Sequence, residues 1–270
     1  MEQGNRADFF NKEVELTTTV TEDVSNIFSG VKDLTYTVSE DGKRGQVQTL
    51  IDNAYPETTL ENLKSFDVNG YGQKLKKFSV DVRDDRHSHE ITVDFTAHDF
   101  AGNELIQTKS FVIDPVAPIV KNTVTSKANK LNGKYYKDDV VVTTEITERF
   151  LNIENDVIYS IKIDEGGTKS LTLAQLKETR NQNKYGISNI SVEYEENQAG
   201  KTDNTMSKIT ITFSEEHDYI IHTSVKDMAG NQTDKAVEEF VIDKTAPVVN
   251  VTYYRYGDGK AFVPSATEEN

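Results

Sequence analysis

The stretch Asp99-Phe100-Ala101-Gly102-Asn103 decides the fold, because it returns as Asp227-Met228-Ala229-Gly230-Asn231, 227 − 99 = 128 residues later. A repeat at a long, fixed period indicates tandem copies of one structural unit. The glycine of each copy supplies a backbone position with positive φ, and the aspartate accepts backbone N–H groups, as in Asx turns. We therefore predict a structural turn between the last two strands of each unit. Its residues are Asp99, Gly102, Asn103, Asp227, Gly230 and Asn231.

A second motif follows each turn and sets the domain organisation. Phe111-Val112-Ile113-Asp114 recurs as Phe240-Val241-Ile242-Asp243, and Ala117-Pro118 recurs as Ala246-Pro247. The offset here is 240 − 111 = 129, so one residue has been inserted between the two motifs. The repeat predicts a first module over residues 1–116, whose opening strand is missing, and a second over 117–245. Residues 246–270 are expected to be the truncated start of a third module.

The hydrophobic pattern between these motifs has a period of two, which is typical of half-buried strands. Several short strands per unit, with turn signals between them, favour a sandwich, because one such sheet cannot bury its apolar face alone. The predicted fold class is all-β, with tandem immunoglobulin-like β-sandwiches. The strands of the first module carry Val14 to Val20, Leu34 to Val38, Phe78 to Val82, Ile91 to Ala97 and Phe111 to Ile113. In the second they carry Val140 to Ile146, Tyr159 to Ile163, Ile209 to Phe213, Tyr219 to Val225 and Phe240 to Ile242. This alignment matches Leu34 with Tyr159.

One short helical turn is expected in each module. Thr58-Thr59-Leu60-Glu61 and Thr172-Leu173-Ala174-Gln175 both have the Thr-x-x-Glu/Gln form of a helix capping box. Leu63 and Leu176 follow at equivalent places. The remaining patterned segments show no longer helical period.

Charge and composition exclude several classes of function. The net charge of −15 repels phosphate backbones, so we expect no nucleic-acid partner. There is no cysteine, which excludes disulfides, thiolate metal sites and a cysteine nucleophile. No run of 18 apolar residues occurs, so we expect no membrane insertion. Residues 1–6 do not resemble a signal peptide, and export and anchoring signals are expected to lie outside this stretch.

The aspartates of the repeated motifs are the candidate metal ligands. Asp114 and Asp243 lie at the predicted module junctions, where acidic residues can bind Ca²⁺. Calcium takes six to eight oxygen ligands, so one aspartate per junction is too few without Glu22, Glu148 or a loop. The alternative interpretation is that the aspartate ends a strand and the following proline stiffens the linker. We expect no cofactor and no firm metal site; the calcium candidates are Asp114, Asp243, Asp99 and Asp227.

The histidines and hydroxyl groups show no catalytic arrangement. His87, His89 and Glu90, with Asp84, Asp85 and His98 nearby, would suit a transition metal, but a solvated hairpin explains them more simply. None of the five histidines, His87, His89, His98, His217 and His222, lies in a nucleophile-elbow context, and Gly166-Gly167 is interpreted as a hairpin rather than a phosphate loop. The sequence therefore predicts that the chain is not an enzyme.

Four motifs in one order, present twice, resemble the bacterial immunoglobulin-like repeats of large surface proteins. The best match is carried by Glu216-His217-Asp218-Tyr219, Asp227 to Asn231 and Phe240 to Pro247. Ile146 to Phe150 resembles a further stretch of that family, and the similarity covers about residues 9–262. The first module departs from the pattern at Pro115-Val116 and at His89-Glu90-Ile91. The resemblance implies an extracellular, non-catalytic module of a Gram-positive or gut bacterial surface protein.

Three functions are consistent with these observations. The first is a stalk or adhesion module of a bacterial cell-surface protein, whose partners are neighbouring immunoglobulin-like modules. The second is a module whose loops bind a glycan or a host protein, with Tyr253-Tyr254-Arg255-Tyr256 as the candidate platform. The alternative interpretation of that run is the opening strand of the truncated third module. The third is an accessory spacer of a secreted enzyme.

Overall fold

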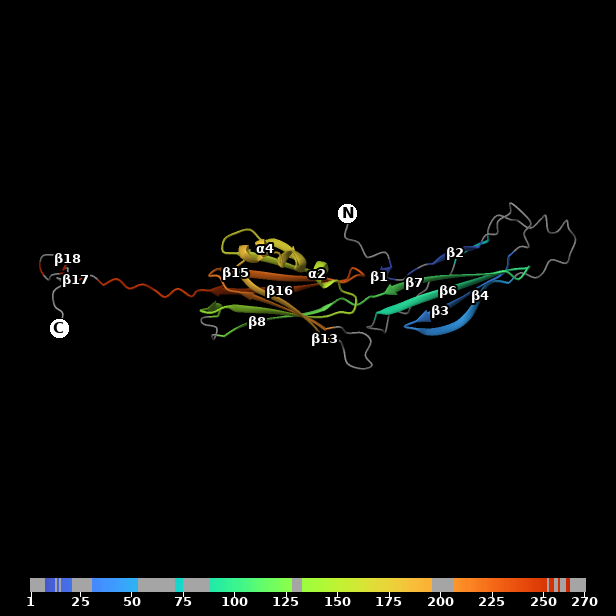
Figure 1. Cartoon of the computed structure of the whole chain (residues 1–270), viewed down its shortest axis with the longest axis horizontal. Helices are drawn as coiled ribbons and strands as arrows, with labels where there is room; N and C mark the ends of the chain where they lie inside the picture. The colour runs from blue at the N-terminus through green and yellow to red at the C-terminus, as the bar shows by residue number, and fades with distance from the viewer. Residues whose placement is uncertain are drawn as a thin grey trace.

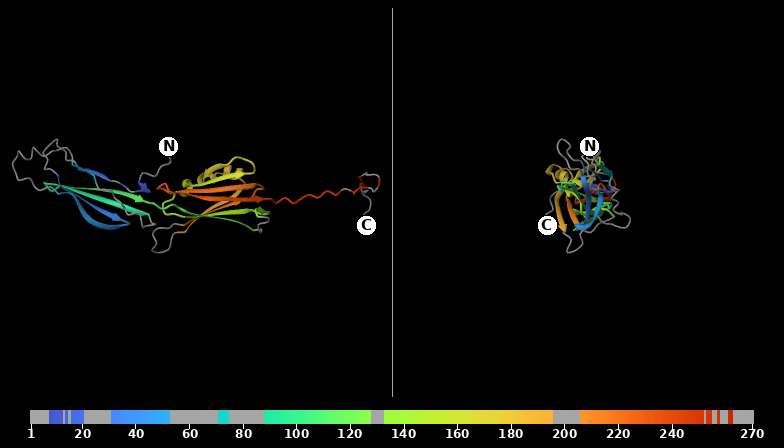
Figure 2. Two further views of the ribbon diagram at one scale, coloured as in Figure 1. Left: turned by 180° about the vertical axis from the view of Figure 1, so that it is seen from behind. Right: turned by 90° about the vertical axis from the view of Figure 1, so that its right-hand side faces the viewer.

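A computed structural model of the chain shows two β-sandwich modules joined end to end (Figures 1 and 2). It describes residues 8–12, 14, 16–20, 31–52, 71–74, 88–127, 133–195, 206–251, 253–254, 257 and 261–262. A view along the long axis superimposes the two modules, whereas a view across it shows them in line (Figure 2). The all-β fold class is confirmed. Among the helices described here, none is long and apolar enough to cross a membrane.

The first module is built on a five-stranded sheet. Its strand order is β1 (Phe9–Phe10), β7 (Glu104–Ile113), β6 (His89–Asp99), β3 (Val31–Glu40) and β4 (Lys43–Asp52). All neighbours are antiparallel except β1, which pairs parallel to β7. A second, two-stranded sheet joins β2 (Thr17–Val20) to β5 (Tyr71–Lys74). The core of the first module is formed by Leu34, Ile91, Val93 and Phe111, with other apolar residues of its strands.

The second module has two larger sheets. One has the order β13 (Ile187–Glu195), β14 (Met206–Phe213), β10 (Val140–Thr147) and β8 (Ile119–Ser126). The other has the order β12 (Lys169–Thr172), β11 (Val157–Ile163), β15 (Asp218–Lys226), β16 (Gln232–Ile242) and β9 (Tyr135–Tyr136). Three short helices accompany them: α2 (Ile153–Asp156), α3 (Leu173–Leu176) and α4 (Thr179–Lys184).

Strict alternation explains the core of the second module. In β10, β14 and β15 every second residue is buried, as the sequence pattern predicts. Phe240 lies among the aromatic rings of Phe213, Tyr219 and Tyr136, with ring centroids 5.4, 5.0 and 6.5 Å away. Edge-to-face and stacked pairs at such distances stabilise a core beyond the burial of their area.

Three details differ from the sequence prediction. Tyr36 pairs with Phe95 and Tyr159 pairs with Thr223, so Tyr36, and not Leu34, is the counterpart of Tyr159. The error of two residues keeps each side chain on the same face, which is why periodicity did not reveal it. The described part of the second module carries three short helices instead of one, although α3 does begin with the expected Thr172–Gln175 capping box. The helix at 58–63 and the strand at 78–82 lie outside the described residues.

The segment after the second module runs away from it in extended form (Figure 1). Asp243 to Val251 are all exposed, and Val248, Val249 and Val251 are 84%, 79% and 69% exposed. Further on, β17 (Tyr253–Tyr254) pairs with β18 (Ala261–Phe262) in a two-stranded ribbon. The described part of the third repeat is therefore strand-like but not packed against the second module.

Candidate metal centre

The linker between the modules is bound by the end of the second module. The side-chain amide of Asn231 donates to the carbonyl oxygens of Asp114 (2.8 Å) and Val116 (3.2 Å). The Thr233 hydroxyl donates to the carbonyl oxygen of Pro118 at 2.6 Å. Pro118 itself is buried. The second module thus fixes the path of the chain as it leaves the first.

The turn from Asp227 to Asn231 prepares Asn231 for this task. Gly230 has φ +92°, a conformation that favours glycine, and its N–H donates to the Asp227 carbonyl oxygen. The Asp227 carboxylate accepts from both the backbone and the side-chain amide of Asn231, each at 2.8 Å. In the second module the repeated motif is therefore a hydrogen-bonded turn that directs the Asn231 amide group toward the preceding linker.

Three buried carboxylates meet behind this loop. One oxygen each of Asp114, Glu148 and Asp227 lies within 4.8 Å of the other two. The residues are 1%, 9% and 4% exposed, respectively. Asp114 directly follows β7, the last strand of the first module, whereas Glu148 follows β10 and Asp227 follows β15 of the second. The cluster therefore spans the junction.

Burial makes this cluster costly when it is fully charged. Loss of hydration, together with the neighbouring Asp114 and Asp227 charges, raises the pKa of Glu148 to about 7, although the hydrogen bond from the Phe150 N–H opposes the rise. Burial likewise raises the pKa of Asp114 to about 6, opposed by a hydrogen bond from the Val116 N–H. The pKa of Asp227 is also raised by burial, against its hydrogen bonds with Asn231. At this spacing each charged pair repels by on the order of 3 kcal/mol at the dielectric typical of proteins.

The geometry of the cluster suits a cation. Oδ2 of Asp114 is buried and has no hydrogen-bond partner among the described residues. Buried polar atoms are nearly always satisfied, so this oxygen is a candidate ligand atom for a cation. Oxygens within 4.8 Å of one another have roughly the spacing found around one Ca²⁺, which contacts each oxygen at about 2.3–2.6 Å. Carboxylates suit such hard cations better than soft transition metals.

The other calcium candidates from the sequence are not brought into this cluster. Asp243 is exposed and accepts the Thr245 N–H at 3.2 Å, the same local turn that Asp114 makes with Val116. Asp99 lies at the opposite end of the first module and binds Asn103 through its backbone and side-chain amides at 2.8 and 2.6 Å. Glu22 lies outside the described residues.

The histidines occupy separate places. His89 Nδ1 lies 3.1 Å from Asp41 and 2.8 Å from Glu40, and His217 Nδ1 lies 2.8 Å from Asp164 in the equivalent hairpin. His98 bridges Asp33 and Glu104, which raise its pKa by hydrogen bonding. Asp84, Asp85 and His87 lie outside the described residues, and the structure does not bring His89 and His98 together, because they lie at opposite ends of β6.

Two further contacts join the modules beside the carboxylates. Arg149 of the second module forms an ion pair with Glu90 of the first at 2.6 Å. The Phe150 ring packs edge-on against Phe9 with centroids 5.2 Å apart. The adjacent Arg149 guanidinium also lies 4.8 Å from the centre of the Phe150 ring. The segment Glu148 to Phe150 thus supplies an ion pair and an aromatic contact across one interface, and the Arg149–Phe150 contact lies within the segment itself.

Comparisons with known proteins add little to this description. The chain matches no protein-family model, and a search of curated proteins gives no match. Among solved structures, it is similar to the surface glycan-binding protein SGBP-B of the Bacteroides ovatus mixed-linkage glucan utilization locus, solved with a mixed-linkage heptasaccharide. The identity is 14%, the match covers 88% of this chain and 43% of that chain, and the TM-score is 0.17. A TM-score of this size carries no structural argument.

Proposed function

We propose that the chain is a non-catalytic spacer of a bacterial surface protein, in which a Ca²⁺ ion at the module junction locks two immunoglobulin-like modules into a stiff rod. The observation that carries the proposal is the buried cluster of Asp114, Glu148 and Asp227, with the unpartnered Oδ2 of Asp114 inside it. Without a cation, three buried carboxylates repel one another where the modules meet. With one, they become ligands that hold the linker to the second module.

The origin of the three ligands explains why binding would stiffen the rod. Asp114 belongs to the first module, and the other two carboxylates belong to the second. An ion that binds all three is favoured only while the junction is closed, so its binding free energy stabilises that arrangement. The Asn231 contacts with the linker and the Glu90–Arg149 pair also oppose opening of the junction.

The location at a bacterial surface rests on the resemblance of the repeated motifs, and a spacer role fits modules arranged in line (Figure 2). Glycan or host-protein binding and service as the spacer of a secreted enzyme remain the alternatives. Binding of the chain to a glycan array would favour the second function over a purely mechanical one.

A substitution with a matched control tests the cation site. Asp114→Asn removes one charge from the cluster, whereas Asp243→Asn makes the same change in the same motif at an exposed position. In EDTA, at a pH above 7.5, Asp114→Asn should melt at or above the temperature of the unchanged protein, because repulsion is relieved. In Ca²⁺ the order should reverse, and a site at about 100 times its Kd contributes about 2.7 kcal/mol.

Asp243→Asn should respond to Ca²⁺ as the unchanged protein does. If Ca²⁺ shifts the melting of none of the three proteins, or shifts all three equally, the junction does not bind it. A cation site predicts that the order of the two melting temperatures reverses between EDTA and Ca²⁺. If Asp114 had a purely structural role, Asp114→Asn would instead be less stable than the unchanged protein in both solutions.

A further inference from the structure

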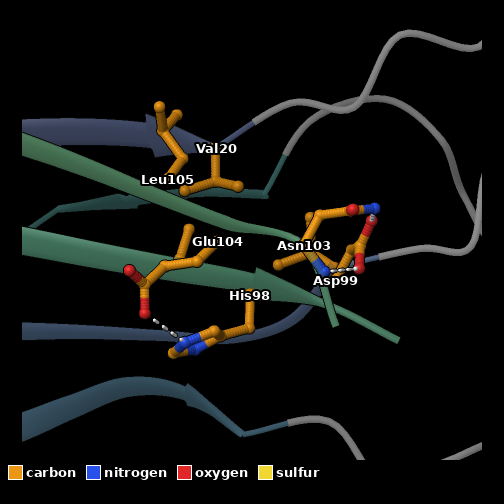
Figure 3. A pocket seen from close by; sticks show the side chains of 8 residues that line it. Val20, His98, Asp99, Asn103, Glu104 and Leu105 are labelled. Atoms are coloured by element: carbon orange, nitrogen blue, oxygen red, sulfur yellow. Dashed lines mark hydrogen bonds and ion pairs between the residues drawn. The ribbon is translucent and has the colours of Figure 1, made fainter. Parts of the chain in front are cut away.

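A pocket lies at the far end of the first module (Figure 3). Its strand pairing matches that of the linker-binding end of the second module. The pocket is an open depression of about 150 Å³ lined by apolar and polar side chains: Val20, Val31, Ala97, His98, Asp99, Asn103, Glu104 and Leu105. Asp99, Asn103 and Leu105 are the counterparts of Asp227, Asn231 and Thr233. The strand pairing fixes this equivalence, since Ala97 pairs with Leu105 as Val225 pairs with Thr233.

The loop at this pocket is already in its binding geometry. Gly102 has φ +89°, and the Asn103 backbone N–H donates to Asp99 at 2.8 Å. The Asn103 side-chain amide contacts Asp99 at 2.6 Å, as Asn231 contacts Asp227. In the second module the same amide also binds two linker carbonyl groups. Within the described residues, the Asn103 side-chain amide makes the contact with the aspartate of its own turn but no contact with a linker carbonyl group.

The chain also contains a second copy of what the second module binds. Asp243 to Pro247 repeats Asp114 to Pro118. Both aspartates accept the N–H two residues on, so the two segments begin with the same turn. Pro118 is buried, whereas Pro247 is exposed, and Val120 is 3% exposed against 79% for its counterpart Val249.

Contacts with the second module orient this exposed segment. Lys244 binds Asp139 at 2.7 Å and the Ser214 carbonyl oxygen at 2.6 Å. Thr245 donates to the Glu216 carboxylate. The segment is therefore held at its base while its apolar residues stay exposed, a state that favours binding to a complementary surface.

We propose that the pocket lined by Val20, Asn103 and Leu105 is a socket for an Asp-x-x-Ala-Pro segment, and that it binds residues 243–249 of a second copy of this chain. In the docked state, the Asn103 amide donates to the carbonyl oxygens of Asp243 and Thr245. Pro247 occupies the place that Pro118 takes in the second module, and Val249 lies beside Val20. Leu105 replaces Thr233, so this socket is more apolar and lacks the hydroxyl contact with the proline carbonyl.

The consequence is head-to-tail association through the joint that already connects the two modules. This inference rests on the proposed function in one respect, because it treats the Asp-x-x-Ala-Pro segment as a connector between modules. The covalent linker holds its segment at an effective concentration in the millimolar range, so association between chains must be measured up to roughly 1 mM.

Two exposed neighbours on β7 provide a matched pair of variants. Leu105 is 67% exposed and lines the pocket, whereas Ile106 is 57% exposed and, as the next residue of the strand, faces the opposite side. Sedimentation velocity should show the mass of the unchanged chain rising with concentration. Leu105→Arg should abolish the rise, and Ile106→Arg should leave it. A monomer at every concentration, or association that survives Leu105→Arg, would overturn the proposal.

A synthetic peptide of residues 240–250 probes the socket directly. The peptide is added to ¹⁵N-labelled Leu105→Arg and Ile106→Arg chains. It should shift the amide signals of Gly102 and Asn103 in the Ile106→Arg chain but not in the Leu105→Arg chain. A peptide with Pro247→Glu should shift these signals in neither chain. Absence of shifts with the unaltered peptide contradicts the inference. The Leu105→Arg chain keeps Asp114, Glu148 and Asp227, so its response to Ca²⁺ tests the junction site independently.

Discussion

Glu148 and Asp114 make the junction sensitive to pH in a direction opposite to that of an ordinary surface salt bridge. Burial raises both pKa values, to about 7 and about 6, above those of the unfolded chain. A carboxyl with a raised pKa binds more protons when folded, so the folded state is penalised at high pH and relieved as pH falls through 7 and 6. A Ca²⁺ ion competes with those protons, so its affinity falls over the same range.

We therefore predict opposite pH profiles with and without Ca²⁺. In EDTA the melting temperature should rise as the pH falls from about 8 to about 5.5, because Glu148 and then Asp114 become neutral. The gain from Ca²⁺ should shrink over the same interval. Glu148→Gln should flatten the EDTA profile near pH 7. Calorimetric scans at four pH values measure both effects, and a melting temperature in EDTA that falls with pH contradicts the assignment.

At the scale of elements, β16 and β15 hold the second module through one aromatic cluster. Phe240 is fully buried among Phe213, Tyr219 and Tyr136. Phe240→Ala should cost about 3–5 kcal/mol, the range for a buried aromatic that leaves a cavity. Tyr135→Ala, on the exposed side of β9, should cost less than about 0.5 kcal/mol. Hydrogen exchange of the β15 and β16 amides reports on this module alone, and equal loss of protection in both variants would show that the strand phase is wrong.

The elements also show what the sequence could and could not predict. Strands with one buried face, such as β10 and β15, were predicted because their alternation is strict. Strand β13 was missed because a register shift between Ile187 and Asn189 breaks its period, and β4 because its described side chains are almost all exposed. The carboxylate cluster was predicted only in part, because Asp114 and Asp227 meet through the packing of two modules, which periodicity does not encode. The repeat identified both aspartates as candidate ligands, but it did not predict the hydrogen bonds of Asn231 with the linker.

On the scale of the whole molecule, a row of modules behaves as a rod only if each joint resists bending. The joint here combines the carboxylate cluster, the Asn231 contacts with the linker, the Glu90–Arg149 pair and the Phe9–Phe150 contact. Interfaces between domains of one chain permit movement unless they are large and apolar. The contacts described at this joint are mainly polar, so under the proposed function a bound ion would decide how stiff the rod is.

The distance between the modules, measured with spin labels, tests this claim most directly. The chain has no cysteine, so Gln107→Cys and Lys169→Cys place one label on an exposed strand of each module without side reactions. At pH 8 in Ca²⁺ the distribution of distances should be narrow. The distribution should broaden in EDTA. Asp227→Asn should keep it broad even in Ca²⁺, whereas the control Asp243→Asn should give the same narrow distribution in Ca²⁺ as the unchanged protein. Identical distributions in Ca²⁺ and EDTA would contradict a cation-locked junction.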